Sequence, residues 1–235
     1  MNRRAQSHVI GVAVLLGITI AAIASLTASA GLLIDSHAAE ADSNRVATGL
    51  ESALHPTSSS SSETVHFVDG SLSPVERHTE IRVDGETTHR IRTDGLVYTG
   101  QSNRRVVFEA GGLVRTHSGG GTLQTGPTLT RGTSVFVIGI TRLGTDVSGV
   151  GGSGGTSVSV RTNTTHERHS LEAGDRFTVA IETATPAAWE RYFEKRGATT
   201  TREPGDPPMV AATFDGDRDG YLVVHDLSLE LTPDG

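Results

Sequence analysis

An acidic segment near the C-terminus has the residue types and spacing of a cation-binding loop. The segment "DGDRDGYLVVHD" offers oxygen ligands at regular intervals: Asp215, Asp217, Asp219, the carbonyl of Tyr221, and Asp226 at the twelfth position. Calcium prefers such carboxylate and carbonyl oxygens, and a glycine permits the sharp turn of an EF-hand loop. However, Asp226 replaces the usual bidentate glutamate, and the flanking residues predict strands. Calcium is therefore the one cofactor that the sequence suggests, and a plain acidic β-turn is the alternative.

Other reactive residues carry weaker signals. Asn163 begins the sequon "NTT", which makes it a candidate glycosylation site in an exported domain. His166 and His169 in "HERH" have no third metal ligand nearby, and we expect them in a solvated loop. The chain has no cysteine, no nucleophile elbow and no phosphate-binding loop. We therefore predict that the protein is not an enzyme.

The N-terminal region contains the element that dominates the sequence. Residues 5–34 hold no Asp, Glu, Lys or Arg, and a helix of that length exceeds the roughly 30 Å of a bilayer core. We expect a transmembrane helix with a short cytoplasmic N-terminus, because Arg3 and Arg4 precede it, and an extracellular C-terminal domain. The run is too long for a conventional secretory signal peptide.

The helical pattern continues beyond the apolar run. Val46, Gly49, Leu50, Ala53 and Leu54 recur at three- and four-residue spacing, which predicts an amphipathic continuation to about residue 55. We expect its apolar stripe to dock on the globular head. The segment 56–63, with Pro56 and a run of serines, is predicted to be a linker.

The junction "RR-AQSHVIG" is the most specific feature. It resembles the class III signal of archaeal type IV pilins, and especially the haloarchaeal pattern in which "AVSPVIG" follows a basic region; Ala5, Ser7, Val9, Ile10 and Gly11 match, whereas Gln6 and His8 depart from it. The resemblance implies cleavage by a prepilin peptidase between Arg4 and Ala5. It also implies that residues 5–55 stay on the mature protein as an assembly helix, with residues 1–4 as the leader.

The remainder, residues 64–235, is predicted to be a β-rich domain. Short alternating segments end at Gly turns, with hairpins around Asp84-Gly85 and Gly111-Gly112, and "SVFVIGITRL" is expected to be the central strand. One short helix, "TPAAWERYFEKRG", places Trp189, Tyr192 and Phe193 on one face. We expect these rings to pack on the sheet; a carbohydrate- or partner-binding aromatic patch is the alternative.

Composition limits the classes of partner. The formal net charge of −7 argues against nucleic acid, and the excess of acidic residues with a single lysine suits a protein from a high-salt environment or a GC-rich genome. The predicted fold class is α+β: a long pilin-type hydrophobic helix followed by a mainly antiparallel β-rich head.

Together these features predict a type IV pilin-like surface protein, a minor pilin or pseudopilin. Its partners would be the membrane, the prepilin peptidase and other pilin subunits bound through the N-terminal helix, and its head would serve adhesion or partner contact. The competing prediction is a singly membrane-anchored exoplasmic binding domain that does not polymerise.

Overall fold

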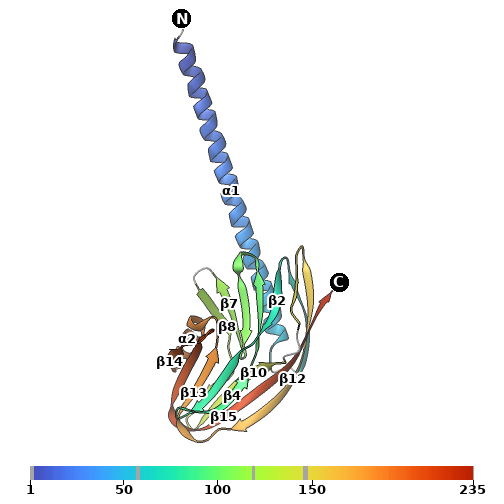
Figure 1. The fold of residues 1–235 in the computed structure, drawn as a ribbon, viewed down its shortest axis with the longest axis vertical. Coiled ribbons are helices and arrows are strands. Elements are labelled where there is room, and N and C mark those ends of the chain that lie inside the picture. The colour runs from blue at the N-terminus through green and yellow to red at the C-terminus, as the bar shows by residue number, and fades with distance from the viewer. Residues whose placement is uncertain (1–2, 57–58, 118–119, 145–147, 235) are drawn as a thin grey trace. The chain divides into compact units, whose positions relative to one another are not determined.

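The computed structural model describes residues 3–56, 59–117, 120–144 and 148–234; for residues 3–15 and 27–36 it describes the backbone alone. Two compact units are present, Met1–Ala41 and Asp42–Gly235, and we call the second unit the head. Helix α1 (Arg3–Ala53) supplies the described part of the first unit and begins the second (Figure 1).

In the part that the structure describes, the head contains fifteen strands and two short helical segments besides the last turns of α1. In chain order these are β1 (Ser60–Phe67), β2 (Gly70–Val75), β3 (His78–Val83), β4 (Glu86–Arg92), β5 (Gly95–Gly100), η1 (Gln101–Asn103), β6 (Arg105–Glu109), β7 (Gly112–His117), β8 (Gly120–Thr125), β9 (Leu129–Arg131), β10 (Val135–Leu143), β11 (Val150–Gly152), β12 (Thr156–Ser170), β13 (Gly174–Glu182), α2 (Pro186–Glu194), β14 (Thr199–Glu203) and β15 (Met209–Asp234).

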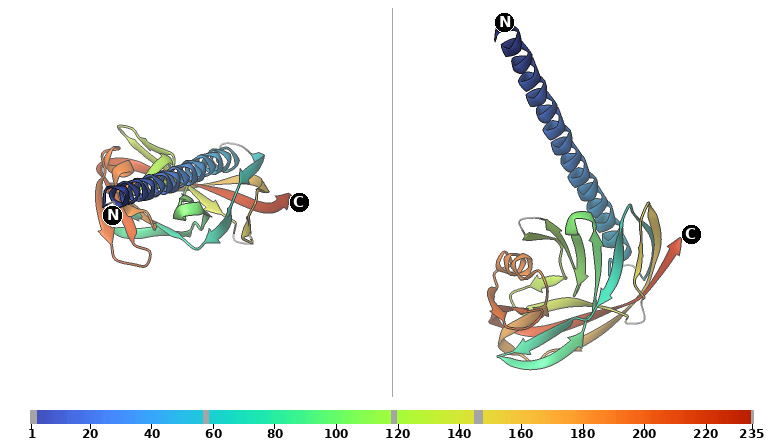
Figure 2. Two further views of the ribbon diagram at one scale, coloured as in Figure 1. Left: turned by 90° about the horizontal axis from the view of Figure 1, so that it is seen from above. Right: turned by 45° about the horizontal axis from the view of Figure 1, so that its top comes forward.

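The strands form two sheets. The six-stranded sheet has the order β11-β2-β5-β6-β7-β8, and the nine-stranded sheet contains the path β1-β12-β15-β13-β3-β4 together with β9, β10 and β14. The described strand pairs are antiparallel except β10–β15, which is parallel. The long strands β12 and β15 curve across the head in every view (Figures 1 and 2).

The hairpins follow from local backbone chemistry. At Asp84-Gly85 both residues have positive φ, 49° and 94°, which is the signature of a tight turn that matches the twist of the two strands. The second predicted hairpin turns at Ala110-Gly111, with φ of 51° and 88°, so Gly112 already belongs to β7. The predicted central strand is β10, which is almost wholly buried.

Two hydrophobic clusters hold the head together. In the first, valines of the six-stranded sheet meet Phe136, Phe177 and Phe214 of the other sheet and the aromatic face of α2. In the second, the last turns of α1 pack between the sheets, against residues such as Phe67, Leu96 and Val160. The end of α1 is therefore part of the head's core.

The predicted α+β class with a pilin-type hydrophobic helix is wrong, because the described structure is mainly antiparallel β. Helix α1 has the predicted length, but among the residues with described side chains no helix combines the length and apolar character needed to cross a membrane. The predicted transmembrane helix is corrected on that finding.

Two segment boundaries also differ from the prediction. The serine run assigned to a linker over 56–63 enters β1 at Ser60, where it pairs with β12. The compact head begins at Asp42 and not at residue 64, because the amphipathic turns of α1 fold together with the strands.

Candidate functional site

The predicted processing junction lies in the first turns of α1. The backbone from Arg3 onward is helical, whereas the side chains of Arg4, Ala5, Ser7, Val9, Ile10 and Gly11 lie outside the described residues. Cleavage between Arg4 and Ala5 therefore stays a prediction.

Residues 16–26 of α1 expose a dense set of large aliphatic side chains. Their exposed fractions run from 60% to 72%, and we call this set the α1 apolar surface; its members are Leu16, Ile18, Ile20, Ile23 and Leu26. Within this stretch the Ser25 hydroxyl donates to the carbonyl of Ala22 at 2.9 Å. This bond satisfies the hydroxyl within the helix, so the stretch presents mainly hydrocarbon to its surroundings.

Large and small side chains occupy different sides of this stretch. At about 100° per residue, Leu16, Ile20 and Ile23 share one side of the helix. Gly17, Ala21 and Ala24 repeat the same spacing one residue later and therefore lie about 100° away. A Cβ on Gly17 would meet nothing within 4 Å. The helix thus carries a ridge of large residues beside a shallow strip of small ones.

The last turns of α1 are fixed in the head by a buried carboxylate, which we call the Asp42 anchor. Asp42 is 6% exposed, and its Oδ2 accepts hydrogen bonds from the backbone N–H of Val68 at 2.9 Å and from the Tyr98 hydroxyl at 3.0 Å. Burial, reinforced by the charge of Asp42, raises the pKa of Tyr98, so its hydroxyl stays protonated and keeps donating. Arg45 pairs with the other oxygen at 3.0 Å.

The predicted stripe of α1 forms the apolar part of this attachment. Val46, Leu50, Ala53 and Leu54 are at most 1% exposed, and a Cβ on the partly buried Gly49 would lie 3.0 Å from Val65. At the end of the helix, the Thr162 hydroxyl of β12 donates to the carbonyl of Ala53 at 2.9 Å. The predicted docking of this stripe on the head is confirmed.

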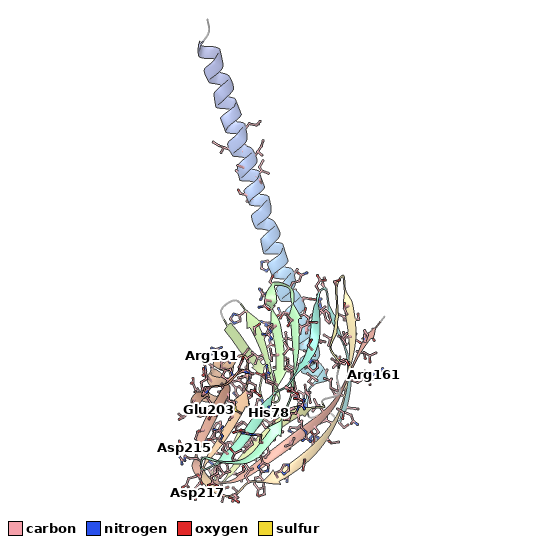
Figure 3. All side chains as sticks on the ribbon, in the orientation of Figure 1. His78, Arg161, Arg191, Glu203, Asp215 and Asp217 are labelled. Atoms are coloured by element: carbon pink, nitrogen blue, oxygen red, sulfur yellow. The ribbon has the colours of Figure 1, made fainter. Side chains whose placement is uncertain are left out.

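The structure does not gather the candidate calcium ligands. Asp215 and Asp217, labelled in Figure 3, and Asp219 are exposed residues of the continuous strand β15. Asp226 binds Arg142 through both carboxylate oxygens. Strand residues rise about 3.3 Å each, so Asp226, eleven residues after Asp215, lies far along β15, whereas an EF-hand loop would have to fold back on itself. Among the described residues, no group of three or more His, Asp or Glu could hold a metal ion. The acidic β-strand is the better interpretation.

Two further predictions concern β12. Asn163 is exposed on this strand, opposite Ser228 of β15 and Ser60 of β1, so its side chain is accessible as the sequon requires. The "HERH" segment is also part of β12 and not a loop. His166 lies 2.8 Å from His225 between their Nδ1 atoms, and the ring centroids of His169 and His89 are 5.1 Å apart.

Helix α2 buries its aromatic face, as the packing interpretation predicted. Trp189 and Phe193 are fully buried and Tyr192 is 7% exposed. The Trp189 Nε1–H and the Thr183 hydroxyl both donate to Oε1 of Glu109, while the guanidinium Nε of Arg77 lies 3.4 Å from its Oε2. Burial raises the pKa of Glu109, although these three partners favour its charged form. The aromatic patch is therefore unavailable to a ligand.

A groove runs between α2 and the edge strand β8. Two adjoining hollows of about 250 and 420 Å³ meet at Ala188, and we call the pair the α2–β8 groove. Arg191, Lys195 and Arg196 line the smaller hollow beside Thr122 and Gln124, and Arg105 lines the larger one. Arg191 donates to the carbonyl of Gly121, and the Arg196 guanidinium lies 3.7 Å from the centre of the Tyr192 ring.

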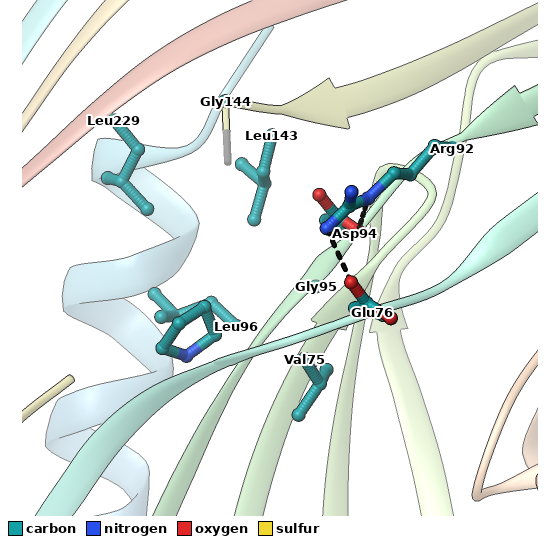
Figure 4. A pocket seen from close by; sticks show the side chains of 10 residues that line it. Val75, Glu76, Arg92, Asp94, Gly95, Leu96, Leu143, Gly144 and Leu229 are labelled. Carbon is teal, nitrogen blue, oxygen red and sulfur yellow. Dashed lines mark hydrogen bonds and ion pairs between the residues drawn. The ribbon is translucent and has the colours of Figure 1, made fainter. Parts of the chain in front are cut away.

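A smaller cavity of about 130 Å³ lies at the ends of β2 and β5 (Figure 4). Its cation, Arg92, already pairs with Asp94 at 2.9 Å and with Glu76 at 2.8 Å. With its charges neutralised internally, this cavity offers little to a charged ligand.

Comparison with known proteins places the chain in a family. The model of a family of unknown function, DUF7289, matches residues 4–230 and so spans α1 and almost all of the head. The chain belongs to the DUF7289 family. No curated protein matches it, and no solved structure does.

Sequence reasoning missed two parts of this picture. The Asp42 anchor joins residues from α1, β5 and the β1–β2 turn, and nothing in the local sequence marks Asp42 as buried. The α2–β8 groove joins residues of α2 to residues of β7 and β8 that lie far away in the chain, so no local pattern marks it. The signal that could have found it is the i, i+4 spacing of Arg191 and Lys195 in a chain with only one lysine.

Proposed function

We propose that the protein is a type IV pilin-like subunit, a minor pilin or pseudopilin, that assembles with further copies or related chains through α1 and displays the head at the cell surface. The observation that carries this proposal is the α1 apolar surface, with five large aliphatic side chains at 60–72% exposure on one short stretch of helix. Full burial of such a side chain stabilises an assembly by about 1.5–3 kcal/mol. Burial of all five side chains in a contact between subunits would therefore strongly favour association.

The two sides of this stretch suit a repeating contact. The ridge of Leu16, Ile20 and Ile23 on one helix fits against the small-residue strip of Gly17, Ala21 and Ala24 on the next, where the backbones can approach closely. The two surfaces differ, so each subunit would use one to bind its predecessor and the other to bind its successor. Such a head-to-tail contact builds rings or open filaments.

The attachment of α1 to the head supports display. The Asp42 anchor and the buried stripe make the last turns of α1 part of the head's core, so a subunit that assembles through α1 carries its folded head with it. The junction at Arg4 and Ala5 adds support from the sequence, because its resemblance to class III signals implies processing and export.

The test is the assembly state of the native full-length protein. We expect filaments or large oligomers by electron microscopy and sedimentation, dispersed by Ile20→Arg and retained in the matched variant Ile20→Leu. Ile20→Arg places a charge in the proposed contact and should leave the melting of the head unchanged, because Ile20 is 60% exposed.

Processing gives a second readout. N-terminal sequencing should find Ala5 as the first residue, and Arg4→Ala should block that processing. A monomeric wild-type protein that still begins at Met1, or assembly that tolerates Ile20→Arg, would contradict the proposal.

A further inference from the structure

The charges of α2 are separated by side. Glu190 faces β14, where both its oxygens bind Arg202 at 2.8–2.9 Å, and Glu194 accepts a hydrogen bond from Thr200 at 2.7 Å. Arg191 and Lys195, each one residue further along, face β8 and line the α2–β8 groove. The acidic residues of this helix are thus neutralised on one side, while its basic residues gather on the other.

The groove is basic in a strongly acidic protein. Within the described part of the chain, no Asp or Glu lines either hollow, although the chain carries 27 acidic and 20 basic residues. Arg191, Lys195 and Arg196 stand together at the smaller hollow, and Arg105 extends the positive charge into the larger one. A cleft that is lined by one sign of charge and bounded by low-dielectric protein focuses the electrostatic field and attracts ligands of the opposite sign.

Two of these cations are held in place before any ligand binds. The Arg191 guanidinium is tied to the carbonyl of Gly121, and the Arg196 guanidinium is stacked on Tyr192 at 3.7 Å, where the aromatic face attracts it. Both side chains therefore lose less conformational entropy on binding an anion than free surface arginines would.

We propose that the α2–β8 groove binds a linear acidic polysaccharide. The cations would bind sugar carboxylates or sulfates, and the polar groups between them, Thr122 and Gln124 in one hollow and Thr116 and Thr185 in the other, would hydrogen-bond sugar hydroxyls. The groove follows β8, whose six residues span about 20 Å, so it matches an extended chain better than a compact ion.

The same lining disfavours a nucleic acid. Recognition of single strands relies on exposed aromatic rings for base stacking, and the rings of α2 are buried beneath the groove.

The inference concerns the head and does not require assembly, so it can fail or hold independently of the proposed function. The experiment measures binding of the full-length protein to polygalacturonate and dextran sulfate. Neutral dextran, oligo(dT) and polyglutamate serve as the comparison probes.

We expect polygalacturonate or dextran sulfate to bind, and the double variant Arg191→Gln/Lys195→Gln to weaken that binding about tenfold, because each exposed cation contributes modestly. Lys195→Arg should bind like wild type. The matched control is Arg161→Gln, which removes the same charge from an exposed residue of β12 in a different part of the head (Figure 3). Raising the salt from 0.1 to 1 M should weaken binding by shortening the screening length from about 10 to about 3 Å.

Several results would overturn the proposal: no binding of either acidic polysaccharide, equal binding of neutral dextran, or an equal loss with Arg161→Gln. Tighter binding of oligo(dT) or polyglutamate than of both polysaccharides would do the same and would assign the groove to a nucleic acid or an acidic peptide. Lys195→Gln alone leaves every contact of Arg191 intact, so it keeps the test valid if the double variant folds poorly.

Discussion

Two stretches of the same helix differ sharply in how deeply their large apolar side chains are buried. Residues 16–26 of α1 leave their large aliphatic side chains 60–72% exposed, whereas Val46, Leu50 and Leu54 of the same helix are at most 1% exposed. The second stretch is amphipathic and completes the head's core; the first is apolar on several sides and has no core of its own within the described chain. The difference shows that one helix can complete the head's core at one end and leave large aliphatic side chains exposed at the other.

The largest expected effect is a cavity in the buried stretch. Leu50→Ala should lower the free energy of unfolding of the head by about 2–5 kcal/mol, because Leu50 is fully buried among side chains from both sheets. Chemical denaturation followed by tryptophan fluorescence measures it, since Trp189 is the only tryptophan and lies in the head. The matched variant Leu26→Ala should leave the transition unchanged; an equal loss there would erase the contrast between the two stretches.

Removing the Asp42 anchor should have a smaller effect. Asp42→Ala removes the acceptor of the Val68 backbone N–H and one of the two acceptors of the Tyr98 hydroxyl, which also lies 3.1 Å from the carbonyl of Asp69. The buried N–H left without a partner should cost about 1–3 kcal/mol. Asp42→Asn, which keeps one acceptor oxygen, should recover part of the loss in the same denaturation experiment. If Asp42→Ala melts like wild type, polar anchoring of the helix is unimportant beside its apolar packing.

A change of pH should alter the stability of the head but not the contacts proposed for residues 16–26. Burial, reinforced by His166, lowers the pKa of His225 below its ordinary value of 6.5, so the folded head prefers the neutral ring. Its stabilising contribution is therefore present above pH 6.5 and is lost as the pH falls through the lower folded value. Residues 16–26 contain no titratable group, so self-association through them should not change over the same interval.

The measurement is the difference in unfolding free energy between wild type and His225→Gln at pH 7.5 and 5.5. We expect this difference to shrink on acidification. The subtraction removes the opposing contribution of Glu109, whose pKa is raised by burial and whose ionisation costs stability as the pH rises. A difference that grows on acidification would mean that the folded state favours the charged ring.

The smallest expected effect on folding is at the α1 apolar surface. Ile18→Ala should change the unfolding free energy by less than about 0.5 kcal/mol, because Ile18 is 65% exposed. Under the proposed function the same variant should weaken assembly, which sedimentation can measure on the same sample. A marked loss of head stability would show that the apolar surface packs within its own chain.

Local patterns predicted much of the secondary structure. The three- and four-residue spacing from Val46 to Leu54 predicted the docking stripe. The Asp84-Gly85 pair predicted a hairpin, because both residue types readily adopt the positive φ that its turn requires. The fold class and the membrane-spanning helix are wrong, and "DGDRDG", predicted to be a calcium-binding loop or an acidic β-turn, continues β15. Pairing with β10 and β13 holds that segment extended, and the local pattern of turn residues contains no such information.

The sequence by itself determined the long helix, the amphipathic change along it, the antiparallel hairpins and the packing of the α2 rings, because each depends on the periodicity or conformational preference of neighbouring residues. Only the tertiary structure decided that Asp42 is buried, that Asp226 serves Arg142 and not a cation, and that Arg191 and Lys195 share a groove with β8. These outcomes depend on contacts between residues far apart in the chain. The burial and charge state of such side chains depend on partners that no local sequence pattern identifies.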